Sequence, residues 1–131
     1  MATLRAGLIG LGMMGRHHAR NLRAIDGVEL VAVADAQGDP HGVAGGLPVL
    51  PNMEALIEAG IDYAVVALPT EFHADAGQKL AAAGVHALIE KPLAKTTDEA
   101  RELASAFAAA GLIGAVGHIE RYNPALQSLR K

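Results

Sequence analysis

Three glycines early in the chain have the spacing of a phosphate-binding loop. They fit the pattern G-x-G-x-x-G at Gly10, Gly12 and Gly15, with Met13 and Met14 between the last two. Gly10 permits a tight turn out of a strand, Gly12 lets the backbone approach a pyrophosphate, and Gly15 lets the next helix pack closely. The free N–H groups at the start of that helix would bind the phosphates. The pattern alone is weakly specific, since ordinary glycine-rich loops share it.

An acidic residue stands where the ribose of a dinucleotide would need one. Asp35 follows Gly15 by 20 positions and ends the second apolar segment. A carboxylate at that place accepts hydrogen bonds from the adenosine ribose hydroxyls. Ala36 and Gln37 bring no positive charge for a 2′-phosphate, and the carboxylate would repel one. We therefore predict a site for NAD rather than NADP, with a simple turn residue as the alternative role of Asp35.

Polar side chains also follow the fourth, fifth and sixth apolar segments of the chain. They occur in residues 67–73, 90–92 and 117–124. If these segments are parallel strands, their carboxyl ends share one edge of a sheet, which is where open α/β sheets bind ligands. We therefore expect these residues to lie near the glycine loop and Asp35.

Together, the glycine loop, Asp35 and these three segments resemble the amino-terminal domain of the Gfo/Idh/MocA oxidoreductases. The resemblance covers essentially the whole chain, and its most specific motif is the E-K-P tripeptide at residues 90–92. It implies a domain that binds NAD. It also implies an enzyme that transfers a hydride between a nicotinamide cofactor and a hydroxyl group of a sugar, a polyol or a sugar nucleotide.

The resemblance assigns roles to residues at the ends of the fourth and fifth strands. Lys91, as the catalytic residue, would lie beside the nicotinamide ring and the substrate hydroxyl. Pro69 and Thr70 would line the nicotinamide side, where His73 begins the next helix. The full set of cofactor contacts expected in this region is Pro69, Thr70, His73, Glu90, Lys91 and Pro92. A solvated surface lysine is the alternative for Lys91, and a packed histidine at a helix start is the alternative for His73.

Residues after the sixth strand would lead towards the substrate. The resemblance places His118, Glu120, Arg121 and Asn123 on this path, with a linker role as the alternative for Glu120 and Arg121. We expect a dinucleotide-binding domain over residues 1–118 and the start of a linker or helix over 119–131. Family members carry a further domain that supplies most substrate contacts and the oligomer interface. We therefore expect this chain alone to bind cofactor without efficient turnover.

These residues must be positioned by alternating strands and helices. Apolar segments predict strands at residues 4–10, 28–35, 48–50, 61–68, 85–90 and 112–117. Helical periodicity predicts helices at residues 13–24, 52–59, 72–83 and 97–111, with Thr97 as the N-cap of the last. In the first of these helices, Met14, His18 and Leu22 share one face. Such alternation predicts an α/β fold, a doubly wound parallel sheet of the Rossmann type with helices on both faces.

Composition excludes several other classes of protein. The 131 residues are 51% hydrophobic and 19% charged, which indicates one folded domain. A net charge of −3 gives no basic surface for nucleic acid or anionic lipid. The apolar segments are too short to span a membrane. The absence of cysteine fits a cytoplasmic protein, and the histidines show no metal-ligand spacing, so we predict no metal.

Two alternative functions share the glycine loop and Asp35. A nonenzymatic sensor of dinucleotides would keep both features but would not need Lys91. An S-adenosylmethionine methyltransferase also uses a glycine loop and an acidic residue at the end of the second strand. We expect the oxidoreductase, to which the resemblance through the E-K-P tripeptide points, and titration with NADH and with S-adenosylmethionine separates it from the methyltransferase.

Overall fold

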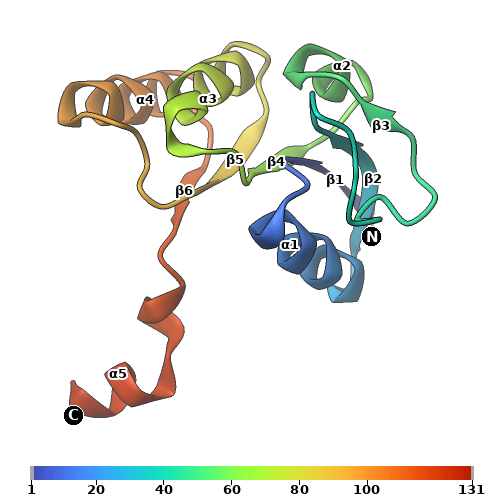
Figure 1. Cartoon of the computed structure of the whole chain (residues 1–131). Helices are drawn as coiled ribbons and strands as arrows, with labels where there is room; N and C mark the ends of the chain where they lie inside the picture. Colours follow the sequence, from blue (N-terminus) through green and yellow to red (C-terminus); the bar gives the residue numbers. More distant parts are fainter. Residues whose placement is uncertain (1, 131) are drawn as a thin grey trace.

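A computed structural model describes residues 2–130 of the chain, which form a six-stranded parallel sheet (Figure 1). The strands are β1 (Leu4–Ile9), β2 (Val28–Ala34), β3 (Val49–Leu50), β4 (Tyr63–Val66), β5 (His86–Glu90) and β6 (Gly114–Gly117). Their order across the sheet is β3-β2-β1-β4-β5-β6, and every neighbouring pair is parallel. The predicted doubly wound Rossmann fold is therefore confirmed. The order reverses between β1 and β4, so a ligand crevice is expected above these two strands.

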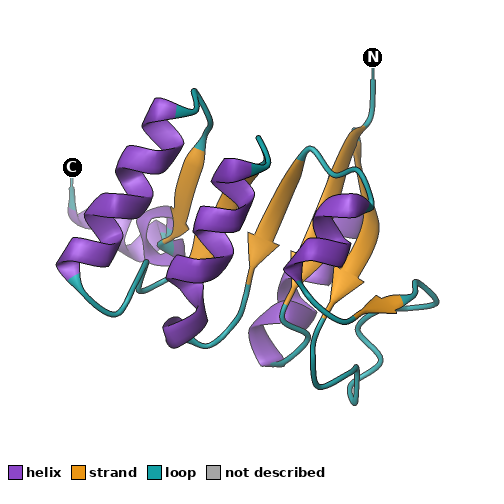
Figure 2. Cartoon of the chain, turned by 90° about the horizontal axis from the view of Figure 1, so that it is seen from above, coloured by secondary structure: helices purple, strands orange, loops and turns teal. Residues whose placement is uncertain are grey.

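Helices cover both faces of the sheet, as predicted (Figures 1 and 2). They are α1 (Met13–Ala24), α2 (Met53–Glu58), α3 (His73–Ala82), α4 (Thr97–Ala109) and the carboxy-terminal α5 (Pro124–Leu129). Alternate residues of each strand point to opposite faces. Leu8 and Val65 therefore pack under α1, while their neighbours Ile9 and Val66 pack under α2 and α3. These two apolar layers fix the strand ends that carry the polar residues.

The element boundaries follow the sequence closely, with small differences at the ends. The first helix has the predicted bounds, whereas β4 is shorter at both ends than the predicted strand at 61–68. Residues 37–46 form turns rather than a helix, as expected from their glycines. The predicted cap of α4 was wrong by one position: Thr96 is the cap, and its Oγ1 accepts a hydrogen bond from Glu99 N at 3.1 Å.

This difference predicts that the two adjacent threonines contribute differently to stability. Thr96→Ala removes the acceptor at the start of α4 and should lower the free energy of unfolding by about 1 kcal/mol. Thr97→Ala is the matched control, because Thr97 occupies the first helical position and alanine favours a helix there. Urea denaturation of both variants measures the difference. Equal losses would contradict the assignment of the cap to Thr96.

The carboxy-terminal segment lies apart from the sheet. After β6, a 3-10 turn η2 (Ile119–Tyr122) leads into α5, and both extend away from the strands (Figure 1). Large apolar side chains on this segment are exposed, among them Ile119, Tyr122 and Leu129. Between residues 2 and 130, no helix has the length and apolar character needed to cross a membrane.

Candidate functional site

A cavity of about 650 Å³ lies along the carboxyl ends of four neighbouring strands. Its floor includes Ile9 at the end of β1, and its walls include the residues that follow β2, β3 and β4. The first turns of α2 and α3 close one side. This volume is within the range of pockets that hold small molecules and cofactors. The cavity lies at the reversal of strand order, where the fold predicts a ligand.

The three glycines of the loop have three different environments. Gly10 has φ +100°, and a Cβ there would collide with the backbone carbonyl of Ala67. A Cβ at Gly15 would collide with the carbonyl oxygen of Gly10, so a side chain would push α1 off the loop. Gly12 differs from both, because no described atom other than those of Gly12 and its two chain neighbours lies within 4 Å of the place of its Cβ. Gly12 therefore borders open space inside the cavity.

The start of α1 is free to accept an anion. Gly12 is the cap residue and offers no side chain to the first N–H groups of the helix, and the first turn holds no acidic residue. Helix N–H groups without a partner, together with the helix dipole, favour a negative charge at this position. Met13 and Met14 border the same cavity and are exposed. The backbone N–H groups of the loop and of the first turn of α1 can thus bind an anionic group such as a phosphate.

Asp35 is held in place by the backbone on both of its carboxylate oxygens. Leu11 N donates to Oδ2 at 2.9 Å, and Gln37 N donates to Oδ1 at 2.8 Å. The first bond ties the glycine loop to the end of β2. Each carboxylate oxygen has two lone pairs, so each can accept one further hydrogen bond. Asp35 also lines the cavity, where those lone pairs can meet hydroxyl groups.

Three charged side chains form the wall between α2 and α3. Lys79 Nζ lies 2.6 Å from Glu54 Oε1 and 3.0 Å from Asp75 Oδ2. The hydrogen bond from Lys79 lowers the pKa of Glu54, and the bonds to Glu54 and Asp75 raise the pKa of Lys79. Of the described residues that line the cavity, Lys79 alone is basic, while Asp35, Glu54 and Asp75 are acidic. The residues that line the cavity therefore carry excess negative charge, and the ammonium group of Lys79 is already paired with two carboxylates.

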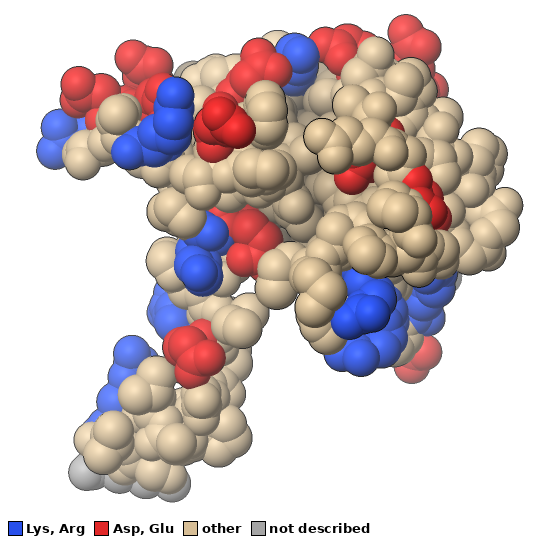
Figure 3. Space-filling view, in the orientation of Figure 1, with Lys and Arg blue, Asp and Glu red and all other residues tan. Residues whose placement is uncertain are grey.

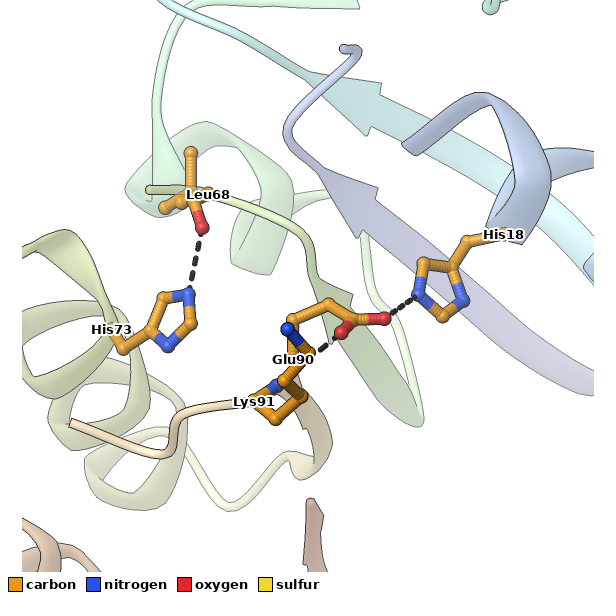
Figure 4. A network of polar contacts seen from close by, with 5 residues as sticks. All are labelled: His18, Leu68, His73, Glu90 and Lys91. Carbon is orange, nitrogen blue, oxygen red and sulfur yellow. Dashed lines mark hydrogen bonds and ion pairs between the residues drawn. The ribbon is translucent and has the colours of Figure 1, made fainter. Parts of the chain in front are cut away.

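Glu90 is buried and paired with a histidine from another element (Figure 4). Its Oε1 lies 2.6 Å from His18 Nε2 of α1, and Lys91 N donates to its Oε2 at 3.3 Å. This pair was not predicted from the sequence, since the two residues are 72 positions apart. A signal was present, because His18 shares the face of α1 with Leu22, and a histidine facing the sheet needs a polar partner. Lys91 itself is exposed.

His73 lies beneath the surface rather than in the cavity. It is 1% exposed, with Nδ1 2.8 Å from the carbonyl oxygen of Pro92 and Nε2 2.7 Å from that of Leu68. Figure 4 shows the ring directed at the segment after β4. This geometry favours the packed alternative for His73. The residue acts on the site through the two segments that it joins.

The predicted residues therefore fall into three groups. Those that line the cavity are Gly10, Gly12, Met13, Met14, Asp35 and Pro69. Those at the same edge of the sheet but outside the lining are Gly15, Thr70, His73, Glu90, Lys91 and Pro92. Those beyond β6 are His118, Glu120, Arg121 and Asn123, which begin the segment that leads away from the sheet.

The residues beyond β6 interact mainly with one another. Asn123 caps α5 by accepting a hydrogen bond from Ala125 N at 2.9 Å, and its Nδ2 donates to Glu120 Oε2 at 2.8 Å. His118, Glu120 and Arg121 are exposed. Across residues 2–130, no group of three or more His, Asp or Glu side chains is arranged to hold a metal ion. Figure 3 shows acidic side chains mainly over α2 to α4, while basic ones lie over α1, near α4 and along the carboxy-terminal segment.

Comparisons with known proteins give a family and several relatives. The profile of the Gfo/Idh/MocA family, described as "Oxidoreductase family, NAD-binding Rossmann fold", matches residues 4–118. UDP-N-acetylglucosamine 3-dehydrogenase of Acidithiobacillus ferrooxidans is 37% identical over 134 residues, which cover 100% of this chain and 42% of that protein. The scyllo-inositol 2-dehydrogenase (NAD(+)) of Bacillus subtilis is 31% identical, covering 98% of this chain and 39% of that protein.

A solved structure shows the same similarity. The crystal structure of GenD2 from gentamicin A biosynthesis in complex with NAD has a TM-score of 0.82 and 31% identity, covering 89% of this chain and 35% of that chain. The chain thus spans about two fifths of the length of the curated relatives that it matches.

Proposed function

Because the chain belongs to the Gfo/Idh/MocA oxidoreductase family through its NAD-binding Rossmann fold, we propose that NAD(H) lies along the carboxyl edge of its sheet. The whole protein would be an oxidoreductase that transfers a hydride between NAD and a hydroxyl-bearing carbon. Its substrate would be a sugar, a polyol or a sugar nucleotide. The named activities of the relatives, which act on UDP-N-acetylglucosamine and scyllo-inositol, support this class of substrate.

One observation carries the proposal: a single cavity joins an uncapped helix start to a carboxylate with free lone pairs. The pyrophosphate would lie over Gly10, Gly12 and the first N–H groups of α1, beside Met13 and Met14. The hydroxyl groups of the adenosine ribose would donate hydrogen bonds to the carboxylate of Asp35. The open space at Gly12 fits the group, since a Cβ there would occupy the place of a phosphate oxygen.

The charges around the cavity favour NAD over NADP. A 2′-phosphate would approach the carboxylate of Asp35, and its charge would be repelled. Lys79 could compensate only by leaving Glu54 and Asp75, which hold it at 2.6 and 3.0 Å. The cavity thus combines a ribose acceptor with a wall of negative charge.

The nicotinamide end would lie beyond the cavity, above the ends of β4 and β5. Pro69 and Thr70 would flank the ring, and His73, Glu90 and Pro92 would complete this end of the cofactor site. Gly15 would serve the pyrophosphate end by letting α1 pack against the glycine loop. Oxidation moves a hydride from the substrate carbon to the cofactor and releases the hydroxyl proton. We assign Lys91 to hold or pass that proton. His118, Glu120, Arg121 and Asn123 are assigned to the substrate side, and residues 1–118 to the cofactor domain.

Location and partners complete the proposal. The absence of cysteine supports a cytoplasmic protein, and a net charge of −3 supports a protein without nucleic-acid or membrane partners. We assign oligomerisation of the whole protein to regions other than this domain.

Cofactor titration tests the proposal through Asp35. NADH should bind to the chain clearly more tightly than NADPH, as measured by calorimetry. Hydrogen bonds to a charged group contribute about 1.5–3 kcal/mol each. Asp35→Ala should therefore weaken NADH binding roughly tenfold or more and remove most of the preference. Asp26→Ala, an exposed aspartate in the turn before β2, is the matched control and should change neither affinity.

Two outcomes would count against the proposal. Equal affinities for NADH and NADPH in the parent chain would exclude the assigned role of Asp35. Binding of S-adenosylmethionine in place of NADH would favour the methyltransferase alternative, which the family match does not support.

A further inference from the structure

Two histidines contact the residues on either side of Lys91, one through a side chain and the other through the backbone. Before it, His18 Nε2 lies 2.6 Å from the carboxylate of Glu90; after it, His73 Nδ1 lies 2.8 Å from the carbonyl oxygen of Pro92. The two histidines come from α1 and α3, on opposite faces of the sheet. Figure 4 shows Glu90 and Lys91 in the space between their rings. The segment is thus held from both faces.

Glu90 and His73 are buried and His18 is half-buried, whereas Lys91 is exposed. Glu90 and His73 are 7% and 1% exposed, and among the described residues they are the buried polar or charged side chains. Burying a polar group is unfavourable unless it is hydrogen-bonded. Such groups therefore have defined partners and a defined geometry. A lysine side chain has many rotamers, so its ammonium group can be aimed only if its backbone is fixed.

The carboxylate of Glu90 connects the first anchor to Lys91 directly. One oxygen faces His18, and the other accepts the N–H of Lys91 at 3.3 Å. Gly117 of β6 leaves room for this carboxylate, because a Cβ there would lie 3.2 Å from Glu90 Cδ. Removing the imidazole of His18 would leave Glu90 free to change rotamer. The bond to Lys91 N would then be lost.

The second anchor joins Lys91 to the segment that borders the cavity. His73 Nε2 lies 2.7 Å from the carbonyl oxygen of Leu68, which precedes the cavity-lining Pro69. Carbonyl oxygens only accept, so a ring nitrogen binds its carbonyl by donating an N–H. His73 thereby joins the segments that follow β4 and β5.

We infer that His18 and His73 are positioning residues that hold Lys91 towards the nicotinamide end of the site. Neither ring has to touch cofactor or substrate. The inference rests on the proposed function for the role of Lys91, whereas the anchoring itself can be measured without cofactor. The two can therefore fail separately.

The anchoring is tested by backbone amide exchange and lysine NMR of the chain. His18→Leu should make the amide of Lys91 exchange roughly tenfold faster, because its carboxylate acceptor is released. His17→Leu is the matched control, since His17 is the adjacent histidine of α1 and its ring contacts Arg20 of the same helix rather than Glu90. Thermal melts confirm that each variant is folded. Unchanged exchange of the Lys91 amide in folded His18→Leu would overturn the role of His18.

Two amide substitutions separate the bonds of His73. The side-chain nitrogen of asparagine lies near the place of Nδ1, and that of glutamine near the place of Nε2. His73→Asn should therefore keep the bond to Pro92 and the parent-like signals of residues 90–92. His73→Gln should keep the bond to Leu68 and lose those signals. If His73 only filled space in the core, both variants would change the signals of residues 90–92 to the same extent. That result would overturn the role of His73.

Isotopic methylation then tests the direction of Lys91. The chain has only four lysines, Lys79, Lys91, Lys95 and Lys131, and methylated lysine keeps its charge. NADH should shift the ¹³C signal of Lys91 by similar amounts in the parent and in His17→Leu. In His18→Leu and His73→Gln, this shift should be at most about half of the parent's. Shifts equal to the parent's in both variants would overturn the inference. Failure of NADH to bind the parent would instead reject the proposed function, while amide exchange would still decide the anchoring.

Discussion

Replacing Gly12 with valine should abolish measurable NADH binding while the chain stays folded. Apart from its two chain neighbours, no residue comes within 4 Å of the place of the Cβ of residue 12, so the added side chain would extend into the open space of the cavity. The side chain would occupy the place of the pyrophosphate and keep it from the first N–H groups of α1. Losing two hydrogen bonds to a charged group, at about 1.5–3 kcal/mol each, corresponds to a hundredfold weaker affinity or more.

Folding should be little affected by this substitution. The backbone of Gly12 has φ −86°, which any residue can adopt. Valine is a poor helix cap, so a loss of about 0.5–1 kcal/mol in the free energy of unfolding is expected. Calorimetric titration with NADH and a thermal melt measure both effects, and Gly12→Ala should give an intermediate affinity. A valine variant that binds NADH like the parent would exclude phosphates from this loop.

Local patterns in the sequence predicted most of the fold. The alternation of strand and helix patterns predicted the parallel sheet. The helical spacing of residues such as His18 and Leu22 predicted α1 with the bounds that the structure shows. Strand ends were less exact, because apolar residues continue past the last ladder bond, as at Leu68 after β4. The cap of α4 was misplaced by one residue because Thr96 and Thr97 are chemically equivalent, and only backbone geometry distinguishes them.

The candidate site was predictable where its residues are close in sequence or recur at strand ends. The glycine loop and Asp35 were identified from spacing, and the structure brings them to one cavity. The contact between His18 and Glu90 was not predicted, because it joins α1 to the end of β5, 72 positions later, and no local pattern indicates which strand end a helix approaches. The orientation of His73 depends in the same way on two backbone carbonyls, which no side-chain pattern reveals.

Gly15→Ala should destabilise the chain strongly, although alanine is the better helix former. At a solvent-exposed position inside a helix, replacing glycine with alanine would raise the free energy of unfolding by about 1 kcal/mol. Here the new Cβ would collide with the carbonyl oxygen of Gly10, a backbone atom that no change of rotamer can move. Gly10 cannot shift freely, since it has φ +100° and packs against the carbonyl of Ala67. We expect a net loss of at least about 2 kcal/mol.

Comparing the same methyl group at two positions of one loop isolates this effect. Gly12→Ala adds it where the structure is open and should shift the melting temperature by no more than about 3 °C, whereas Gly15→Ala should lower it by roughly 5–10 °C. Urea denaturation measures the free energy of unfolding of both variants. For any variant that stays folded, NADH titration should show the opposite order, with the larger loss of affinity in Gly12→Ala, because Gly12 borders the cavity and Gly15 does not. A Gly15→Ala chain as stable as the parent would mean that α1 can move away from β1, and the close packing assigned to Gly15 would be wrong.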